Sequence, residues 1–120
     1  VARPKVWECV HRLKEQGYGI YLLSNYPENL FVKHTREASF MKDVDGAVVS
    51  YQIHITKPDA RIYETLIRRY GLEKNSCLFF DDRQENIDGA IACGIDAKRV
   101  YSQESLLQDL SAILTGKFVL

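Results

Sequence analysis

Two hydrophobic patterns alternate along the chain. Apolar residues that recur every three or four positions predict amphipathic helices, whereas short runs of apolar or β-branched residues predict buried strands. The helical pattern covers residues 4–16, 28–38, 59–70, 84–93 and 102–113. The strand pattern covers residues 20–23, 46–55, 77–80 and 96–101, and the last residues of the second run are also compatible with a loop. The predicted order of elements is α-β-α-β-α-β-α-β-α.

Residues that start and stop helices lie at these boundaries. Asp59 opens the helix over 59–70 with an acidic first turn, and Gly71 follows it as a left-handed stop. Gly17 and Gly94 end two other helices in the same way, and Ser102 opens the last helix as an N-cap. Local chemistry therefore specifies most of the helix ends.

Strands that alternate with amphipathic helices are typical of an α/β protein with a parallel sheet. Because the strands are apolar throughout, helices are expected on both faces, joined by right-handed crossovers. The predicted fold class is a doubly wound parallel sheet in a three-layer α/β/α, Rossmann-like arrangement. Residues 1–120 suffice for a single domain and are too few for two full domains.

Charge and composition narrow the range of partners. Sixteen Lys and Arg residues balance sixteen Asp and Glu residues, so neither nucleic acid nor an anionic membrane is an expected partner. No apolar run approaches the roughly 20 residues of a transmembrane helix, and no leader-like segment opens the sequence. Cys9, Cys77 and Cys93 are odd in number and lack CxxC spacing, so we interpret them as reduced core residues of a soluble, cytoplasmic protein.

Polar residues follow three of the predicted strands, at the sheet edge where parallel sheets bind ligands. Ser24 and Asn25 end the first strand, Lys57 follows the second, and Asp81 and Asp82 end the third. Adjacent carboxylates repel each other unless a cation lies between them, and Mg2+ is the expected ion. The ammonium, hydroxyl and amide groups are donors suited to phosphoryl oxygens. The set predicts a site for a phosphate and a metal ion.

Each of these residues also has a purely structural interpretation. Ser24 with Asn25 is more often a loop start or a helix cap, and a lysine before a proline is usually a solvated loop residue. Asp81 with Asp82 is compatible with helix capping as well as with metal binding. Their joint occurrence at three strand ends favours a site.

With these motifs in this order, the sequence resembles the C-terminal two thirds of a haloacid dehalogenase-like hydrolase. That superfamily consists mostly of magnesium-dependent phosphatases and phosphotransferases. Its second, third and fourth motifs are an apolar strand ending in Ser or Thr, a lysine in a Lys-Pro-Asp stretch before a helix, and an acidic pair after a strand. The counterparts are residues 20–25 (IYLLSN), 57–63 (KPDARIY) and 79–87 (FFDDRQENI).

The resemblance implies a role for each matching residue. Ser24 and Lys57 would bind the transferring phosphoryl group, with Asn25 assisting. Asp82 would ligate Mg2+ directly, and Asp81 would ligate it or hold one of its waters.

The resemblance also implies an activity. The expected reaction is phosphatase or phosphotransferase chemistry on a small phosphorylated metabolite, with a leaning toward sugar phosphates. Asn86, one helical turn beyond the acidic pair, would support the metal ligands.

In the family, the first motif is an apolar strand followed by Asp-x-Asp, and it supplies the nucleophilic aspartate. This motif is absent from residues 1–120. Residues 43–46 (DVDG) imitate it in letters, but they follow no apolar strand, so we interpret them as a turn into the next strand. In the family, the missing strand lies at the centre of the sheet, between the strands ending here at Ser24 and Asp81. We therefore expect a segment upstream of Val1 to complete the sheet, and residues 1–120 alone to be marginally stable and inactive.

Three other interpretations share part of this pattern. A signalling receiver domain combines similar residues, but it carries the acidic pair first and the lysine last. A haloacid dehalogenase in the strict sense uses no metal, whereas an acidic pair suits one. A non-catalytic binding or scaffold protein with the same fold is the main alternative, and it would lack an upstream Asp-x-Asp.

Overall fold

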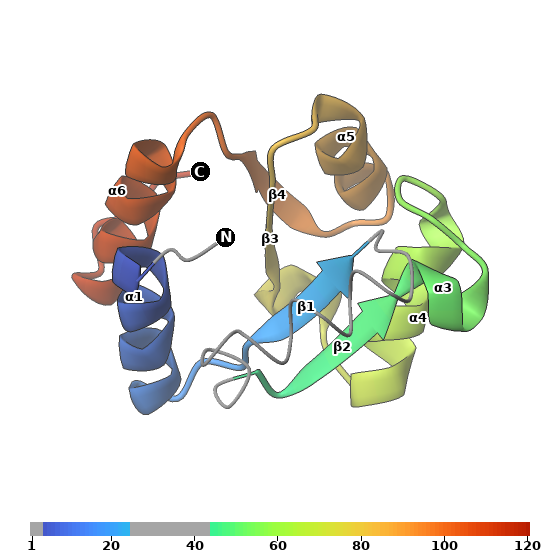
Figure 1. The fold of residues 1–120 in the computed structure, drawn as a ribbon, viewed down its shortest axis with the longest axis horizontal. Helices are drawn as coiled ribbons and strands as arrows, with labels where there is room; N and C mark the ends of the chain where they lie inside the picture. Colours follow the sequence, from blue (N-terminus) through green and yellow to red (C-terminus); the bar gives the residue numbers. More distant parts are fainter. Residues whose placement is uncertain (1–3, 25–43) are drawn as a thin grey trace.

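The computed structural model describes residues 4–24 and 44–120, and Figure 1 shows how their helices and strands are arranged. The helices are α1 (Pro4–Glu15), α3 (Ser50–Ile53), α4 (Ala60–Tyr70), α5 (Gln84–Ala92) and α6 (Gln103–Leu114), with a 3-10 turn, η2 (Lys74–Ser76). The strands are β1 (Tyr21–Ser24), β2 (Gly46–Val49), β3 (Leu78–Asp81) and β4 (Asp96–Arg99). The helix predicted over 28–38 lies outside the described residues.

Local signals determine the helix ends as predicted. The Asp59 carboxylate accepts a hydrogen bond from the Arg61 backbone N–H at the start of α4, and Gly71 ends that helix with φ of 62°. Glycine adopts this left-handed conformation without the strain that a Cβ atom would cause. Ser102 caps α6 by accepting from the Ser105 N–H, and Ser105 Oγ accepts from the Ser102 N–H in return.

The strand predicted over 46–55 ends early. β2 stops at Val49, and Ser50–Ile53 forms the helical turn α3. Ile53 and Ile55 are half-buried and pack against the core beside β2. An extended chain would carry these two residues about 13–20 Å beyond Val49, whereas a helical turn keeps them close to the strand. Burial of the isoleucines thus outweighs the β propensity of the segment.

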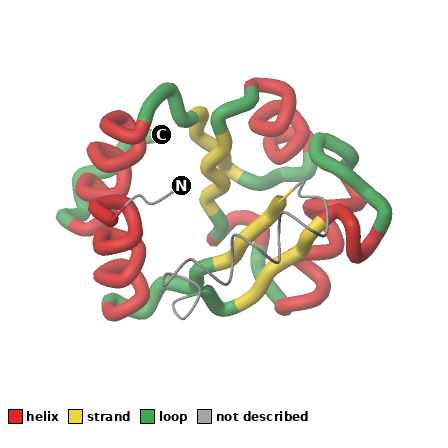
Figure 2. The backbone as a smooth tube through the Cα atoms, viewed as in Figure 1, coloured by secondary structure: helices red, strands yellow, loops and turns green. Residues whose placement is uncertain are grey.

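The four strands form two parallel pairs rather than one continuous sheet (Figure 2). β1 pairs with β2, placing Ser24 opposite Val49, and β3 pairs with β4, placing Asp81 opposite Arg99. Within residues 4–24 and 44–120, β1 has no other partner strand, and neither has β3. The parallel strands and alternating helices are those of the predicted Rossmann-like α/β fold, but the described sheet is divided in two.

Helices cover the strands from two sides, and each side has its own hydrophobic core. α1 packs against α6 around Val10 and Leu110 (Figure 1). On the other side, α4 contacts β2 and α5 contacts β3 and β4, around a core that includes Ile62. Phe79 packs against the α4–α5 core and its neighbour Phe80 against the α1–α6 core. β3 is therefore covered on both faces, as its apolar sequence predicts.

Two composition-based expectations can be compared with the structure. Cys9, Cys77 and Cys93 are free thiols, but each is half-buried rather than a full member of a core. Their position at the margins of the cores corrects the prediction of core cysteines. None of the described helices is both long and apolar enough to cross a membrane.

A cavity of about 790 Å³ lies between the two strand pairs. β1 and β3 line it from opposite sides with Tyr21, Leu22, Leu23, Leu78, Phe79 and Phe80. Side chains of α1, α4 and α6, including Leu13, Leu66 and Leu110, also line it. Protein interiors seldom contain voids much larger than a water molecule. The cavity therefore interrupts the sheet between β1 and β3.

Candidate active site

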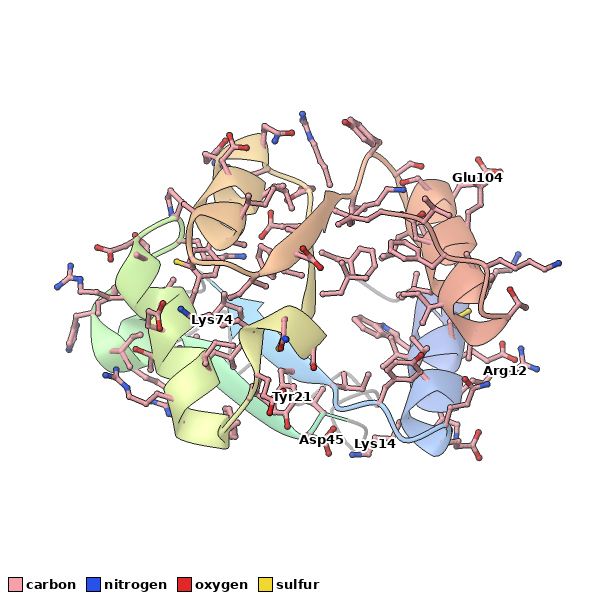
Figure 3. The ribbon with its side chains drawn as sticks, turned by 180° about the vertical axis from the view of Figure 1, so that it is seen from behind. Arg12, Lys14, Tyr21, Asp45, Lys74 and Glu104 are labelled. Carbon is pink, nitrogen blue, oxygen red and sulfur yellow. The ribbon has the colours of Figure 1, made fainter. Side chains whose placement is uncertain are left out.

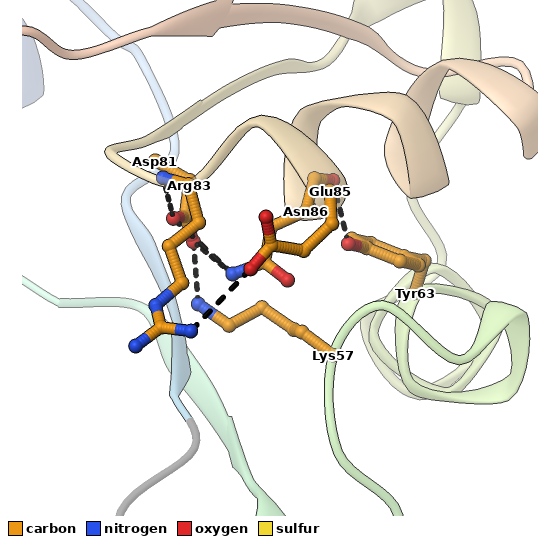
Figure 4. Close-up of polar contacts among 6 residues, drawn as sticks. All are labelled: Lys57, Tyr63, Asp81, Arg83, Glu85 and Asn86. Carbon is orange, nitrogen blue, oxygen red and sulfur yellow. Dashed lines mark hydrogen bonds and ion pairs between the residues drawn. The ribbon is translucent and has the colours of Figure 1, made fainter.

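A lysine and a carboxylate meet at the carboxyl end of β3 (Figure 4). Lys57 Nζ lies 2.6 Å from Asp81 Oδ2, and the two side chains are only 10% and 7% exposed. Nζ also lies 5.7 Å from the centre of the Phe79 ring. A nearly buried ion pair needs additional polar partners to offset its loss of hydration. The groups around Asp81 therefore decide whether the pair is stable.

Asp81 accepts hydrogen bonds from two further residues. The Arg83 backbone N–H donates to Oδ1 over 2.9 Å, and Asn86 Nδ2 lies 3.2 Å from both carboxylate oxygens. Burial raises the pKa of Asp81, but the Lys57 ammonium, the Arg83 N–H and the Asn86 amide outweigh burial and hold the pKa below its usual range. Asp81 is consequently a carboxylate anion at neutral pH.

The chain path explains how these groups converge. Asp81 is the last residue of β3, and α5 begins three residues later at Gln84. Asn86 therefore lies in the first turn of α5, where its side chain points back toward the strand end, and it is 3% exposed. Lys57 reaches the same point from the loop before α4, whose start is fixed by the Asp59 cap.

Tyr63 is a part of this cluster that the sequence did not indicate. Its Oη donates to the Asn86 backbone carbonyl over 2.7 Å, and its ring packs edge-to-face against Phe79 at 5.6 Å. Burial raises the pKa of Tyr63 far above its usual range. The sequence placed Tyr63 in the apolar stripe of its helix. The available signal was the hydroxyl itself, because a buried tyrosine hydroxyl needs a hydrogen-bond partner.

The other predicted site residues lie apart from this cluster or outside the described chain. Ser24 is buried at the carboxyl end of β1, in the strand pair across the cavity from β3. Asn25 lies outside the described residues. Asp82 is exposed, and its backbone carbonyl accepts a hydrogen bond from Arg99 Nε over 3.1 Å. Three of the six predicted residues, Lys57, Asp81 and Asn86, are thus brought together.

The acidic pair Asp81 and Asp82 is the candidate metal site. Within the described residues, no three His, Cys, Asp or Glu side chains converge on one point. Asp81 and Asp82 supply hard carboxylate oxygens, and Mg2+ is commonly held by one or two carboxylates with waters and substrate oxygens. The residues present therefore fit a magnesium ion that takes its other ligands from outside them.

Asp45, the second aspartate of the Asp-Val-Asp-Gly sequence, lies at the amino end of β1. Its Oδ2 accepts from the Ile20 N–H over 2.7 Å, and its Oδ1 contacts Lys14 Nζ (Figure 3). The Lys14 ammonium, together with the Ile20 N–H, holds the pKa of Asp45 below its usual range. Ser24 ends the same strand about 10 Å away. Asp45 therefore holds the start of β2 beside β1, and the first residue of the predicted turn, Asp43, lies outside the described residues.

Comparisons with known proteins agree on one family. Residues 1–94 match the family model described as haloacid dehalogenase-like hydrolase. A phosphatase of Mycobacterium tuberculosis is 30% identical over 123 residues, covering 96% of this chain and 55% of that protein. The (S)-2-haloacid dehalogenase 4A of Burkholderia cepacia is 26% identical over 102 residues, covering 85% of this chain and 44% of that protein. The chain thus spans about half the length of these relatives.

A solved structure supports the fold assignment. It is a variant of a haloacid dehalogenase family enzyme of Bacteroides thetaiotaomicron in complex with magnesium and inorganic phosphate. The two folds agree with a TM-score of 0.73 at 22% sequence identity, over 82% of this chain and 54% of that chain. At this level of identity the likeness concerns the fold, and it confirms the predicted Rossmann-like α/β class.

Proposed function

The chain belongs to the haloacid dehalogenase-like hydrolases, and from this membership we propose that the whole protein is a magnesium-dependent phosphatase or phosphotransferase. The observation that carries the proposal is the contact of Lys57 with Asp81, supported by Asn86, at the carboxyl end of β3. A buried cation beside an acidic pair is the arrangement needed to hold a phosphoryl group next to a metal ion. The proposed substrate is a small phosphorylated metabolite, with sugar phosphates as the favoured class.

The proposal gives each polar group at the strand ends a role. Lys57 and Ser24 bind the phosphoryl oxygens, with Asn25 assisting. Asp82 ligates Mg2+, and Asp81 ligates the ion or orients one of its waters. When bound, the ion offsets negative charge on the phosphoryl oxygens. The free thiols fit a reducing compartment, and we place the protein in the cytoplasm.

The nucleophile is proposed to come from a segment upstream of Val1. The segment would enter the cavity between β1 and β3 as a parallel strand, which is the space the two strand pairs leave open. Such a strand would pair with the inner edges of β1 and β3, so its last residues would emerge between Ser24 and Asp81. An Asp-x-Asp at that point would face both predicted groups. The sequence preceding Val1 tests this directly, because the proposal requires an apolar run that ends in this motif.

The proposed reaction is covalent catalysis in two steps. A carboxylate oxygen of the first upstream aspartate attacks phosphorus, and the bond from phosphorus to the substrate oxygen breaks. The second aspartate gives its proton to the departing oxygen. Water then attacks the aspartyl-phosphate and releases inorganic phosphate, with the second aspartate taking the proton. Lys57 donates hydrogen bonds to the phosphoryl oxygens in both steps.

A dehalogenase is the second candidate, because one of the matched relatives is a haloacid dehalogenase. The acidic pair Asp81 and Asp82 favours the phosphatase, since two neighbouring carboxylates suit a metal. A non-catalytic binding or scaffold protein is the third candidate. Release of phosphate from a phosphate ester would identify the phosphatase, and release of halide from a 2-haloacid would identify the dehalogenase. Release of neither would identify the binding or scaffold protein.

The experiment is a phosphatase assay of the full-length protein with a generic aryl phosphate and Mg2+. Lys57→Ala removes a donor to the phosphoryl oxygens and Asp82→Ala removes a ligand of the metal ion, and each is expected to lower kcat by about 10²–10³. Lys117→Ala, which removes an exposed lysine, is the matched control and should leave kcat unchanged. Unchanged turnover in Lys57→Ala or in Asp82→Ala, in a protein that remains folded, would contradict the assignment.

A further inference from the structure

We propose that Gly89 and Tyr63 are positioning residues that fix where Lys57 meets Asp81. Both residues contact the groups on either side of the Lys57–Asp81 pair. The inference rests on the proposed function for its kinetic consequences alone. Its geometric consequence, the position of Lys57, can be measured without any activity.

Gly89 is the place where the loop that carries Lys57 rests on α5. A Cβ atom at position 89 would lie 2.9 Å from the Pro58 carbonyl oxygen, 2.9 Å from Pro58 Cβ and 3.1 Å from Tyr63 Oη. Two of these three atoms belong to a proline and its backbone, which have little freedom to move aside. Glycine within a helix costs about 0.5–1 kcal/mol relative to alanine. The close approach of Pro58 is the structural reason for a glycine at this helical position.

The same face of α5 also holds the carboxylate. Asn86 precedes Gly89 by three residues, so the two lie on one side of the helix. Asn86 Nδ2 contacts both oxygens of Asp81, while Gly89 receives Pro58, the residue directly after Lys57. One short helix segment therefore sets the position of both partners of the ion pair.

Tyr63 ties α4 to this segment. Its hydroxyl donates to the Asn86 carbonyl over 2.7 Å and lies beside Gly89, and its ring packs on Phe79, the residue two before Asp81. The tyrosine is 1% exposed, so these contacts leave it little room. α4 follows the Lys57 loop directly. Pro58 therefore fixes the start of the segment 57–63 against α5, and Tyr63 fixes its end.

A Cβ atom at position 89 would require Pro58 to move by several tenths of an ångström before ordinary contact distances are restored. Lys57 Nζ lies only 2.6 Å from Asp81 Oδ2, so a shift of its backbone weakens that contact. Misplacement of a reacting group by about 1 Å can lower a rate by about 10². We therefore expect Gly89→Ala to affect catalysis although it improves helix propensity.

The test is competitive acetylation of the full-length protein, with the rate at each lysine read by mass spectrometry. In the unchanged protein Lys57 should react slowly because it is nearly buried and ion-paired. Gly89→Ala should raise the Lys57 rate severalfold and leave that of exposed Lys117 unchanged. Tyr63→Phe, which keeps the ring and removes the hydroxyl, should raise it in the same direction by less. The matched controls are Ala92→Ser on exposed α5 surface and Tyr101→Phe at an exposed tyrosine.

Steady-state kinetics of the same variants provide the second readout. Positioning predicts that kcat falls by about tenfold or more in Gly89→Ala while KM changes little, because Lys57 acts on the transition state. Acetylation of Lys57 at the unchanged rate in both variants would overturn the inference, and so would an equal rise at every lysine, which indicates unfolding. If the unchanged protein shows no phosphatase turnover, the proposed function fails, and the acetylation rates alone decide on the positioning residues.

Discussion

At its carboxyl end, β3 presents a carboxylate that accepts hydrogen bonds from the Lys57 loop and from α5, whereas along the flank facing β1 the same strand borders a cavity of about 790 Å³. The polar cluster is built from residues 57 to 89, which are close in sequence, so its geometry is determined by groups the chain already contains. The flank, by contrast, has no partner strand within residues 4–24 and 44–120. A site can thus be assembled locally in a sheet that is still divided.

The largest expected effect comes from filling the cavity. We expect the protein with the upstream strand to be more stable than residues 1–120 by an amount comparable to the whole stability of a small domain, about 5–15 kcal/mol. The reason is that the strand would bury the apolar side chains lining the cavity and satisfy two unpaired strand edges. Urea unfolding of the two lengths of chain measures the difference. Equal urea midpoints for the two lengths of chain would mean that the upstream segment does not stabilise the fold by filling the cavity.

The next largest effect compares a cavity residue with a core residue in the full-length protein. Ile62 is fully buried between α4 and the strands, so Ile62→Ala should lower the free energy of unfolding by about 2–5 kcal/mol. Leu22 lines the cavity, and Leu22→Ala should lower the free energy of unfolding by a similar amount if a strand covers it. Val119→Ala at an 81% exposed site is the control, expected within about 0.5 kcal/mol of the unchanged protein. A loss below about 1 kcal/mol at Leu22 would indicate that the cavity stays open.

The smallest expected effect concerns the exposed counterpart of the buried ion pair. Asp45 contacts Lys14 at the amino end of the strands, and its pKa is lowered in the folded protein. A lowered carboxyl pKa stabilises the fold above the unfolded value near 4, and this contribution is lost as the pH falls through the folded value. Because the pair is partly exposed to solvent, it should contribute about 0.2–1 kcal/mol. Tm measured between pH 7 and pH 3 should therefore fall less in Asp45→Asn than in the unchanged protein.

Substitution of the partner provides the check on this last prediction. Lys14→Met should remove the same part of the pH dependence, because the ammonium is the main cause of the lowered pKa. A pH dependence that survives in both variants would assign the acid sensitivity to other carboxylates, of which Asp81 is the most buried with a lowered pKa.

The sequence was informative wherever one local interaction determines the outcome. Asp59, Gly71 and Ser102 end or begin helices through contacts within a few residues, and their roles were predictable. The contact of Lys57 with Asp81 was predictable as a shared sheet edge, because parallel strands bring their carboxyl ends together.

What escaped prediction depends on contacts between distant segments. Ile53 and Ile55 favour a strand by type, and only their packing against the core turns the chain into α3. Tyr63 and Gly89 look like ordinary members of an apolar stripe and a small-residue helix. Their importance comes from the approach of the Lys57 loop to α5, which no spacing in the sequence reveals. The structure brings Lys57, Asp81 and Asn86 together, but their roles stay predictions, as do those of Ser24, Asn25 and Asp82.

The division of the strands into two pairs has a consequence for synthesis on the ribosome. β3 begins 54 residues after β1 ends, from Ser24 to Leu78. At about 5–20 residues per second, the two walls of the cavity are made about 3–11 s apart. During that interval the inner edge of β1 is a free template for strand pairing, and such edges promote aggregation. The proposed upstream strand would be synthesised before β1. It could therefore pair with the inner edge of β1 while β3 is still being made, and so protect that edge from aggregation.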